Sequence, residues 1–152
     1  MIAGIVSDTQ NAFVPSRSIS DNILIAHELL NHIRHKKHGI VGDMVIKVDM
    51  HKAYDRISWS NLKMVLIKLG FPDHRVKLIM SCVTTVSYEI LVNETPLQQF
   101  KPLGGLRQGD PLSPYLFVLC MNVLSQNLVR AADNHTVSGI KICNGAPQLS
   151  HL

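Results

Sequence analysis

The chain has 152 residues, 46% of them hydrophobic, a composition that predicts one globular domain with a buried core. Fifteen Lys and Arg against eleven Asp and Glu give a formal charge of +4, which suits a phosphate-rich partner without requiring one. The longest strongly apolar run, residues 115–124, is about half of the roughly 20 residues that a membrane-spanning helix needs, and no signal-peptide pattern follows Met1, so neither a membrane protein nor a secreted one is indicated.

Three cysteines, at positions 82, 120 and 143, are far apart and odd in number. They show neither the paired spacing of a zinc site nor a disulfide framework. We therefore expect a reducing, intracellular location, either the nucleus or the cytoplasm.

The first half of the chain predicts a helix, a strand and two further helices. Ser20 or Asp21 should cap a first helix that runs to about Lys37, because apolar residues recur there every three or four positions. Residues 44–48 are a short apolar run that predicts a strand ending at Asp49. Ser60 should cap the next helix, which ends near the C-cap glycine Gly70. A third helix should start at Asp73 and run to about Cys82.

The second half predicts a hairpin, a loop and a long helix. Residues 86–92 alternate between apolar and polar side chains, and we expect them to pair with residues 97–100 through a turn at Asn93 and Glu94. A loop rich in glycine and proline covers residues 102–111. Ser113 as N-cap and Pro114 at the first helical position should open a helix to about Ala132, with short strands following around residues 137–142. Helices mixed with antiparallel strands predict an α+β fold.

Asp49 is the first candidate functional residue. A carboxylate at the end of a buried strand is held at a sheet edge, where Mg²⁺ can reach it, and the backbone carbonyl of Met50 could add a second ligand. Two such ions, roughly 3.5–4 Å apart, can clamp the attacking and leaving oxygens of a phosphoryl transfer. The alternative is that Asp49 only ends the strand and caps a turn. Tyr54, five residues later, would by default be a core or rim aromatic.

The loop at residues 104–109 is the second candidate. Its three glycines allow a backbone to approach a ligand closely, Gln108 offers both a donor and an acceptor, and Arg107 offers charge for phosphate. It leads into a helix N-terminus, which favours anions. An ordinary turn followed by a helix cap explains the same residues equally well. Arg17, in an earlier polar stretch, could meet phosphate or simply be solvated.

Together these segments resemble the reverse transcriptases of non-LTR retrotransposons, particularly the plant LINE type. The resemblance covers nearly the whole chain and rests on residues 10–22, 47–59, 69–71 and 105–117. Its most specific part is the run Gly-Leu-Arg-Gln-Gly-Asp-Pro-Leu-Ser-Pro, which begins at Gly105, about sixty residues after Asp49.

The resemblance implies an RNA-directed DNA polymerase with a right-hand fold. Residues 1 to about 42 would form a fingers-like segment, and about 43–152 the palm, an antiparallel sheet with packed helices, together with finger insertions. The expected partners are an RNA template, a DNA primer and deoxynucleoside triphosphates, with Mg²⁺ as cofactor; no membrane or protein partner is implied.

The family's residue roles fall on matching positions of this chain. Asp49 resembles the first metal-binding aspartate of the palm, with Met50 contributing its carbonyl. Tyr54 resembles the aromatic residue that blocks a sugar 2′-hydroxyl and so selects deoxynucleotides. The loop that packs against the template and the incoming base pair corresponds to Gln108 and Gly109, beside which Arg107 could steady a phosphate. A template contact is expected for Arg17.

Two departures from the family pattern bear on activity. Gly104 stands where the family usually has an arginine, which could loosen the loop. The family's aromatic-Ala-Asp-Asp hairpin, which supplies further metal ligands, is not found, although residues 148–152 resemble its approach strand. We therefore expect these 152 residues, without that hairpin and a thumb, to be inactive alone. The alternatives are a catalytically dead module that binds RNA or a hybrid, and a retroelement remnant without function.

Overall fold

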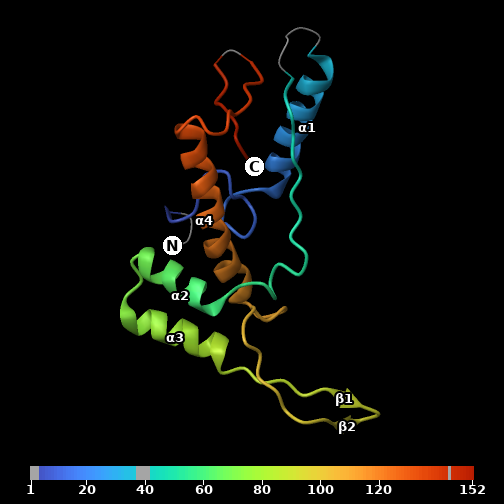
Figure 1. Ribbon diagram of the computed structural model, residues 1–152, viewed down its shortest axis with the longest axis vertical. Helices are drawn as coiled ribbons and strands as arrows, with labels where there is room; N and C mark the ends of the chain where they lie inside the picture. The colour runs from blue at the N-terminus through green and yellow to red at the C-terminus, as the bar shows by residue number, and fades with distance from the viewer. Residues whose placement is uncertain (1–3, 37–41, 144) are drawn as a thin grey trace. The chain divides into compact units, whose positions relative to one another are not determined.

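The computed structural model describes residues 4–36, 42–143 and 145–152. In this part of the chain, helices are combined with a small antiparallel sheet (Figure 1), so the predicted mixture is confirmed. The elements are α1 (Ile19–His35), α2 (Trp59–Lys68), α3 (Asp73–Thr84), β1 (Leu91–Val92), β2 (Thr95–Pro96) and α4 (Ser113–Asp133). No helix among the described residues has the length and hydropathy needed to cross a membrane.

The chain forms two compact units, and α4 contributes to both. One unit consists of Met1–Asp49 and Met121–Leu152, and the other is Met50–Cys120. The first contains α1 and the buried residues Val6 and Val14. Most of the buried apolar side chains belong to the second: Ile57, Leu62, Leu66, Val76, Leu106, Leu116, Val118 and Leu119.

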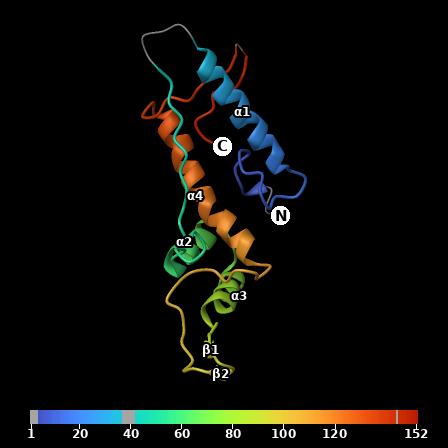
Figure 2. The same ribbon diagram turned by 90° about the vertical axis from the view of Figure 1, so that its right-hand side faces the viewer.

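The packing of α2 against α3 forms the centre of the second unit (Figure 2). Leu62 and Leu66 lie one turn apart on α2 and are fully buried, as their helical spacing predicts. The helix ends where the sequence placed its C-cap, because Gly70 adopts φ +79°. Its N–H and that of Phe71 donate to the last carbonyl groups of α2.

The other helices begin within three residues of their predicted starts. For α1, the cap is Ser18, whose hydroxyl accepts from the Ser20 N–H; its predicted end, at Lys37, lies outside the described residues. For α3, the start is Asp73, as predicted. Ser113 is the first residue of α4 rather than its cap, because the Leu112 carbonyl already accepts the helical hydrogen bond of the Leu116 N–H.

The predicted hairpin is present but shorter than expected. The strands pair Leu91 with Pro96, and a bridge joins Tyr88 to Phe100. The turn falls at Asn93 and Glu94, both with positive φ, as a two-residue hairpin turn requires. Residues 137–142 contribute a single bridge, Ile140 with Leu149, in place of the predicted strands.

The strand predicted at residues 44–48 is wrong for this structure. The segment is irregular, and its Met44, Ile46 and Val48 side chains are largely exposed. A strand requires hydrogen bonds from a neighbouring strand, and none of the described segments pairs with residues 44–48. An apolar run alone therefore does not fix the strand.

The burial of α2 leads to a stability prediction. Leu66→Ala should lower the free energy of unfolding by about 2–5 kcal/mol, because it removes a fully buried side chain and leaves a cavity. Leu78→Ala on α3 is the matched control, since Leu78 is 65% exposed and its loss should cost less than about 0.5 kcal/mol. Urea unfolding followed by circular dichroism measures both. Equal losses would show that the α2 face is not a core.

Candidate functional site

Two segments that lie about fifty residues apart in the sequence are joined by hydrogen bonds in the second unit. The Gly105 N–H donates to the carbonyl of Ile57 at 2.8 Å. The Leu106 N–H donates to the carbonyl of Tyr54 at 3.0 Å. The indole Nε1–H of Trp59 donates to the Gly105 carbonyl at 2.8 Å. The glycine-rich loop is therefore bound directly to the segment that carries Tyr54.

Gly105 is required by this close approach. Its φ is +88°, a conformation that side chains rarely adopt. A Cβ at this position would lie 3.1 Å from the Asp55 Cα and 3.3 Å from the Asp55 carbonyl oxygen. At Gly104 a Cβ would meet only the Ile57 carbonyl oxygen, at an ordinary 3.4 Å. The neighbouring glycines thus differ: one is needed for the contact, and the other leaves room for a side chain.

The ring of Tyr54 is held in place by α4. It stacks on Phe117 with a centroid separation of 4.9 Å and an interplanar angle of 7°. Stacking at this distance adds to the burial of both rings and restricts their orientation. Together with the hydrogen bond at its carbonyl, the stack fixes both the backbone and the side chain of Tyr54.

The next three residues of the loop are accessible. Leu106 is buried, whereas Arg107, Gln108 and Gly109 are exposed. Within the described residues, no carboxylate forms an ion pair with Arg107. A guanidinium that is neither buried nor paired can bind an anion at little desolvation cost.

A cavity of about 390 Å³ lies on one side of the loop. Its lining includes aromatic and charged side chains, among them Trp59, Tyr88, Phe100, Asp55, Arg107 and Asp110. This volume lies at the lower end of the range found for small-ligand sites. Arg107 therefore borders a recess as well as open solvent.

The predicted metal ligands are Asp49 and the backbone carbonyl of Met50. Both are exposed in an irregular segment, and Asp49 is the last residue of its unit before Met50 begins the other. The described residues contain no group of three or more His, Cys, Asp or Glu side chains that could hold a metal ion. The carboxylate of Asp49 therefore belongs to no such group in the part of the chain that the structure describes.

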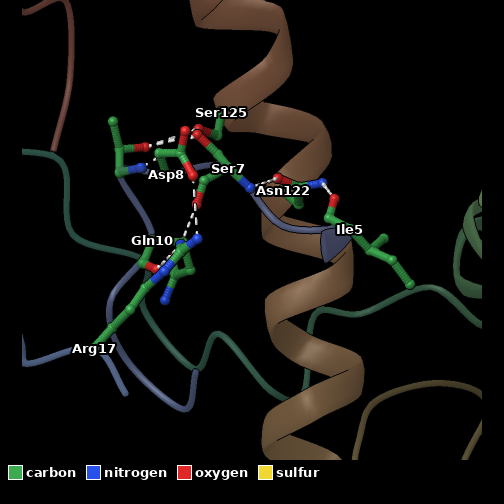
Figure 3. Close-up of polar contacts among 8 residues, drawn as sticks. Ile5, Ser7, Asp8, Gln10, Arg17, Asn122 and Ser125 are labelled. Carbon is green, nitrogen blue, oxygen red and sulfur yellow. Dashed lines mark hydrogen bonds and ion pairs between the residues drawn. The ribbon is translucent and has the colours of Figure 1, made fainter. Parts of the chain in front are cut away.

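Arg17, which belongs to the first unit, is engaged by its own loop (Figure 3). Its Nη1 donates to the carbonyl oxygens of Ser7 at 2.6 Å and Gln10 at 2.7 Å. Its Nη2 lies 3.2 Å from the Asp8 carboxylate. Most of its hydrogen-bonding capacity therefore goes to organising residues 7–17.

Asn122 fixes the same loop to α4, and sequence reasoning missed it. Its side chain is buried; Oδ1 accepts from the Ser7 N–H at 2.9 Å, and Nδ2 donates to the Ile5 carbonyl at 3.1 Å (Figure 3). A buried amide needs such partners. The available signal was an asparagine inside the apolar run 115–124.

A second polar contact to α4 involves His151. Its Nε2 lies 2.6 Å from the Ser125 hydroxyl and 3.4 Å from that of Thr9. Desolvation by burial lowers the pKa of this histidine. On the same helix, burial raises the pKa of the Cys120 thiol to about 11, so that it stays protonated and weakly nucleophilic near neutral pH.

The two glycines provide a matched test of the loop geometry. Gly105→Ala should destabilise the chain by about 1–3 kcal/mol, because it forces alanine into a positive φ and against Asp55. Gly104→Ala should be neutral or slightly stabilising. Urea unfolding of the two variants gives the difference. Equal stabilities would contradict the close approach of the loop to residues 54–57.

Comparison with known proteins gives a consistent family. The model of the family described as "Reverse transcriptase (RNA-dependent DNA polymerase)" matches residues 1–143. An uncharacterized mitochondrial protein of Arabidopsis thaliana is 47% identical over 62 residues, which is 41% of this chain and 51% of that protein.

Two insect proteins match over a longer part of the chain. The retrovirus-related Pol polyprotein from the type-2 retrotransposable element R2DM of Drosophila melanogaster is 29% identical over 78% of this chain and 11% of its own length. A Pol polyprotein from a type-1 element R2 of Nasonia vitripennis is 26% identical over 82% of this chain and 12% of its own. The chain therefore spans about half of the plant relative and roughly a ninth of the insect polyproteins. The match of the family model to nearly all of its residues shows that the chain belongs to the reverse transcriptase family.

Proposed function

We propose that the chain is part of an RNA-directed DNA polymerase, which transfers deoxynucleotides to a primer 3′-hydroxyl on an RNA template. Residues 1 to about 42 would belong to the fingers, and about 43–152 to the palm with its finger insertions. The observation that supports this function is the joining of Tyr54 to the loop at residues 105–109. A polymerase of this family needs a sugar-selecting ring and a template-contacting loop next to one another.

In this proposal Tyr54 acts as a wall against a sugar 2′-hydroxyl. A side chain that selects by steric exclusion must keep its position when a bulkier sugar approaches. The stack on Phe117 restricts how far the Tyr54 ring can move. Gln108 and Gly109, which are exposed in the loop that is bonded to Tyr54 through Leu106, contact the template and the incoming base pair. The unpaired guanidinium of Arg107 holds a phosphate.

Divalent metal ions, for which we propose Mg²⁺, would supply the polymerase chemistry. Asp49 and the carbonyl of Met50 could provide ligands. They do not form a site by themselves, because the described residues contain no group of three or more His, Cys, Asp or Glu side chains that could hold a metal ion. We therefore assign no metal-dependent step to these 152 residues and expect them to show no templated DNA synthesis alone.

RNA binding without catalysis is the second candidate function. It is favoured by the same exposed loop, because Arg107 to Gly109 can contact nucleic acid without a metal. For this chain the two functions differ in what they require. Polymerisation requires the metal ligands to be completed, whereas binding requires only the surface already present.

A primer-extension assay tests the expected inactivity. The 152-residue chain, with Mg²⁺, an RNA template and a DNA primer, should extend no primer, since the described residues contain no group of three or more ligand side chains to hold two ions. Asp49→Ala is the matched control and should match the unchanged chain. Mg²⁺-dependent extension that Asp49→Ala abolishes would contradict the expectation.

RNA affinity tests the role of Arg107. Arg107→Gln should weaken binding to single-stranded RNA and reduce the slope of log K against log salt by about 0.7, the value for one phosphate contact. Lys63→Gln is the control, because Lys63 is an exposed cation on α2 and not a residue of the loop. Fluorescence anisotropy at several salt concentrations gives both quantities. If the two variants have the same slope, Arg107 is not a phosphate contact.

A further inference from the structure

Phe13 combines an exposed ring with an unfavourable backbone conformation. Its side chain is 55% exposed, and its φ is +59°, in the left-handed region that bulky residues rarely occupy. A single exposed apolar residue needs no explanation by itself. An exposed aromatic residue with a strained backbone does need an explanation. A strained backbone persists only where the surrounding structure holds it in place.

The surrounding loop fixes the backbone on both sides of Phe13. Before it, the Gln10 side-chain amide donates to the Ala12 carbonyl at 3.0 Å. After it, Val14 is buried and its N–H donates to the Asn11 carbonyl at 3.4 Å. The loop therefore defines the position of residue 13 while leaving its side chain accessible.

The same loop is anchored to two helices of its unit. The side-chain amide of Asn11 donates to that of Asn22 on α1. Asn122 on α4 holds the backbone of Ser7, and Arg17 closes the loop by donating to Ser7 and Gln10 (Figure 3). The side chains of Asn11, Arg17 and Asn122 thus hold the loop in its conformation. Phe13 is the large apolar side chain of this loop that is exposed and can contact a ligand.

We propose that Phe13 is a stacking platform for a base of single-stranded nucleic acid. This inference rests on the proposed function and adds a contact to it. An aromatic face on a rigid loop binds any base without reading its sequence, because every base has a π-face. The assignment also separates two roles within one loop: Arg17 and Asn122 position it, and Phe13 contacts the ligand.

Binding of a fluorescent single-stranded RNA to the whole chain tests the proposal. Phe13→Ala should weaken binding roughly 5- to 100-fold, the range for losing one base–aromatic stack. The salt slope should not change, because no charge is lost. Phe13→Trp should retain the affinity, since it keeps an aromatic face. Leu24→Ala is the control, because Leu24 is a comparably exposed apolar residue on α1.

An abasic RNA makes the test independent of how well each variant folds. The unchanged chain should bind this RNA more weakly than the intact one, and Phe13→Ala should cause no further loss. If the unchanged chain binds RNA and Phe13→Ala binds it within twofold, the stacking role is wrong while the proposed function stands. If the unchanged chain binds no RNA at all, the proposed function itself fails.

Discussion

The hydrogen bonds from Gly105 and Leu106 to the carbonyls of residues 57 and 54 hold the candidate site together. Backbone hydrogen bonds of this kind contribute only about 0.5–1.5 kcal/mol each to stability, but they also fix the position of the loop relative to residues 54–57. They force a glycine at position 105, bury Leu106, and leave the following three residues exposed. The backbone position of Tyr54 follows from this pairing, whereas the orientation of its ring follows from the stack on Phe117.

Local patterns predicted the helices well. The spacing of Leu62 and Leu66 and the C-cap at Gly70 each depend on neighbours within a few residues, and the structure confirms both. The start of α4 is one residue earlier than predicted, at Ser113. The loop at residues 104–109 was also recognised as unusual from its glycines. The contact of this loop with residues 54–57 could not be predicted from local sequence patterns, because pairing between segments fifty residues apart depends on the fold of the whole unit.

The errors concern features that depend on distant partners. Residues 44–48 have the composition of a strand, yet strand formation requires a neighbour, and the described segments provide none. Asn122 went unnoticed because a pattern of apolar residues gives no weight to one amide among them. Arg17 was expected to contact the template, whereas its partners Ser7 and Gln10 suggest a positioning role; that template contact stays a prediction.

Amide hydrogen exchange at Gly105 and Leu106 tests the central claim most directly. We expect both amides to be protected to about the same degree as the backbone of α2, because their hydrogen bonds break only when the second unit opens. Gln108 and Gly109, which are exposed, should exchange rapidly and serve as the internal reference. Exchange of Gly105 and Leu106 as fast as that of Gln108 and Gly109 would contradict the account, because the loop would then not be bound to the segment that carries Tyr54.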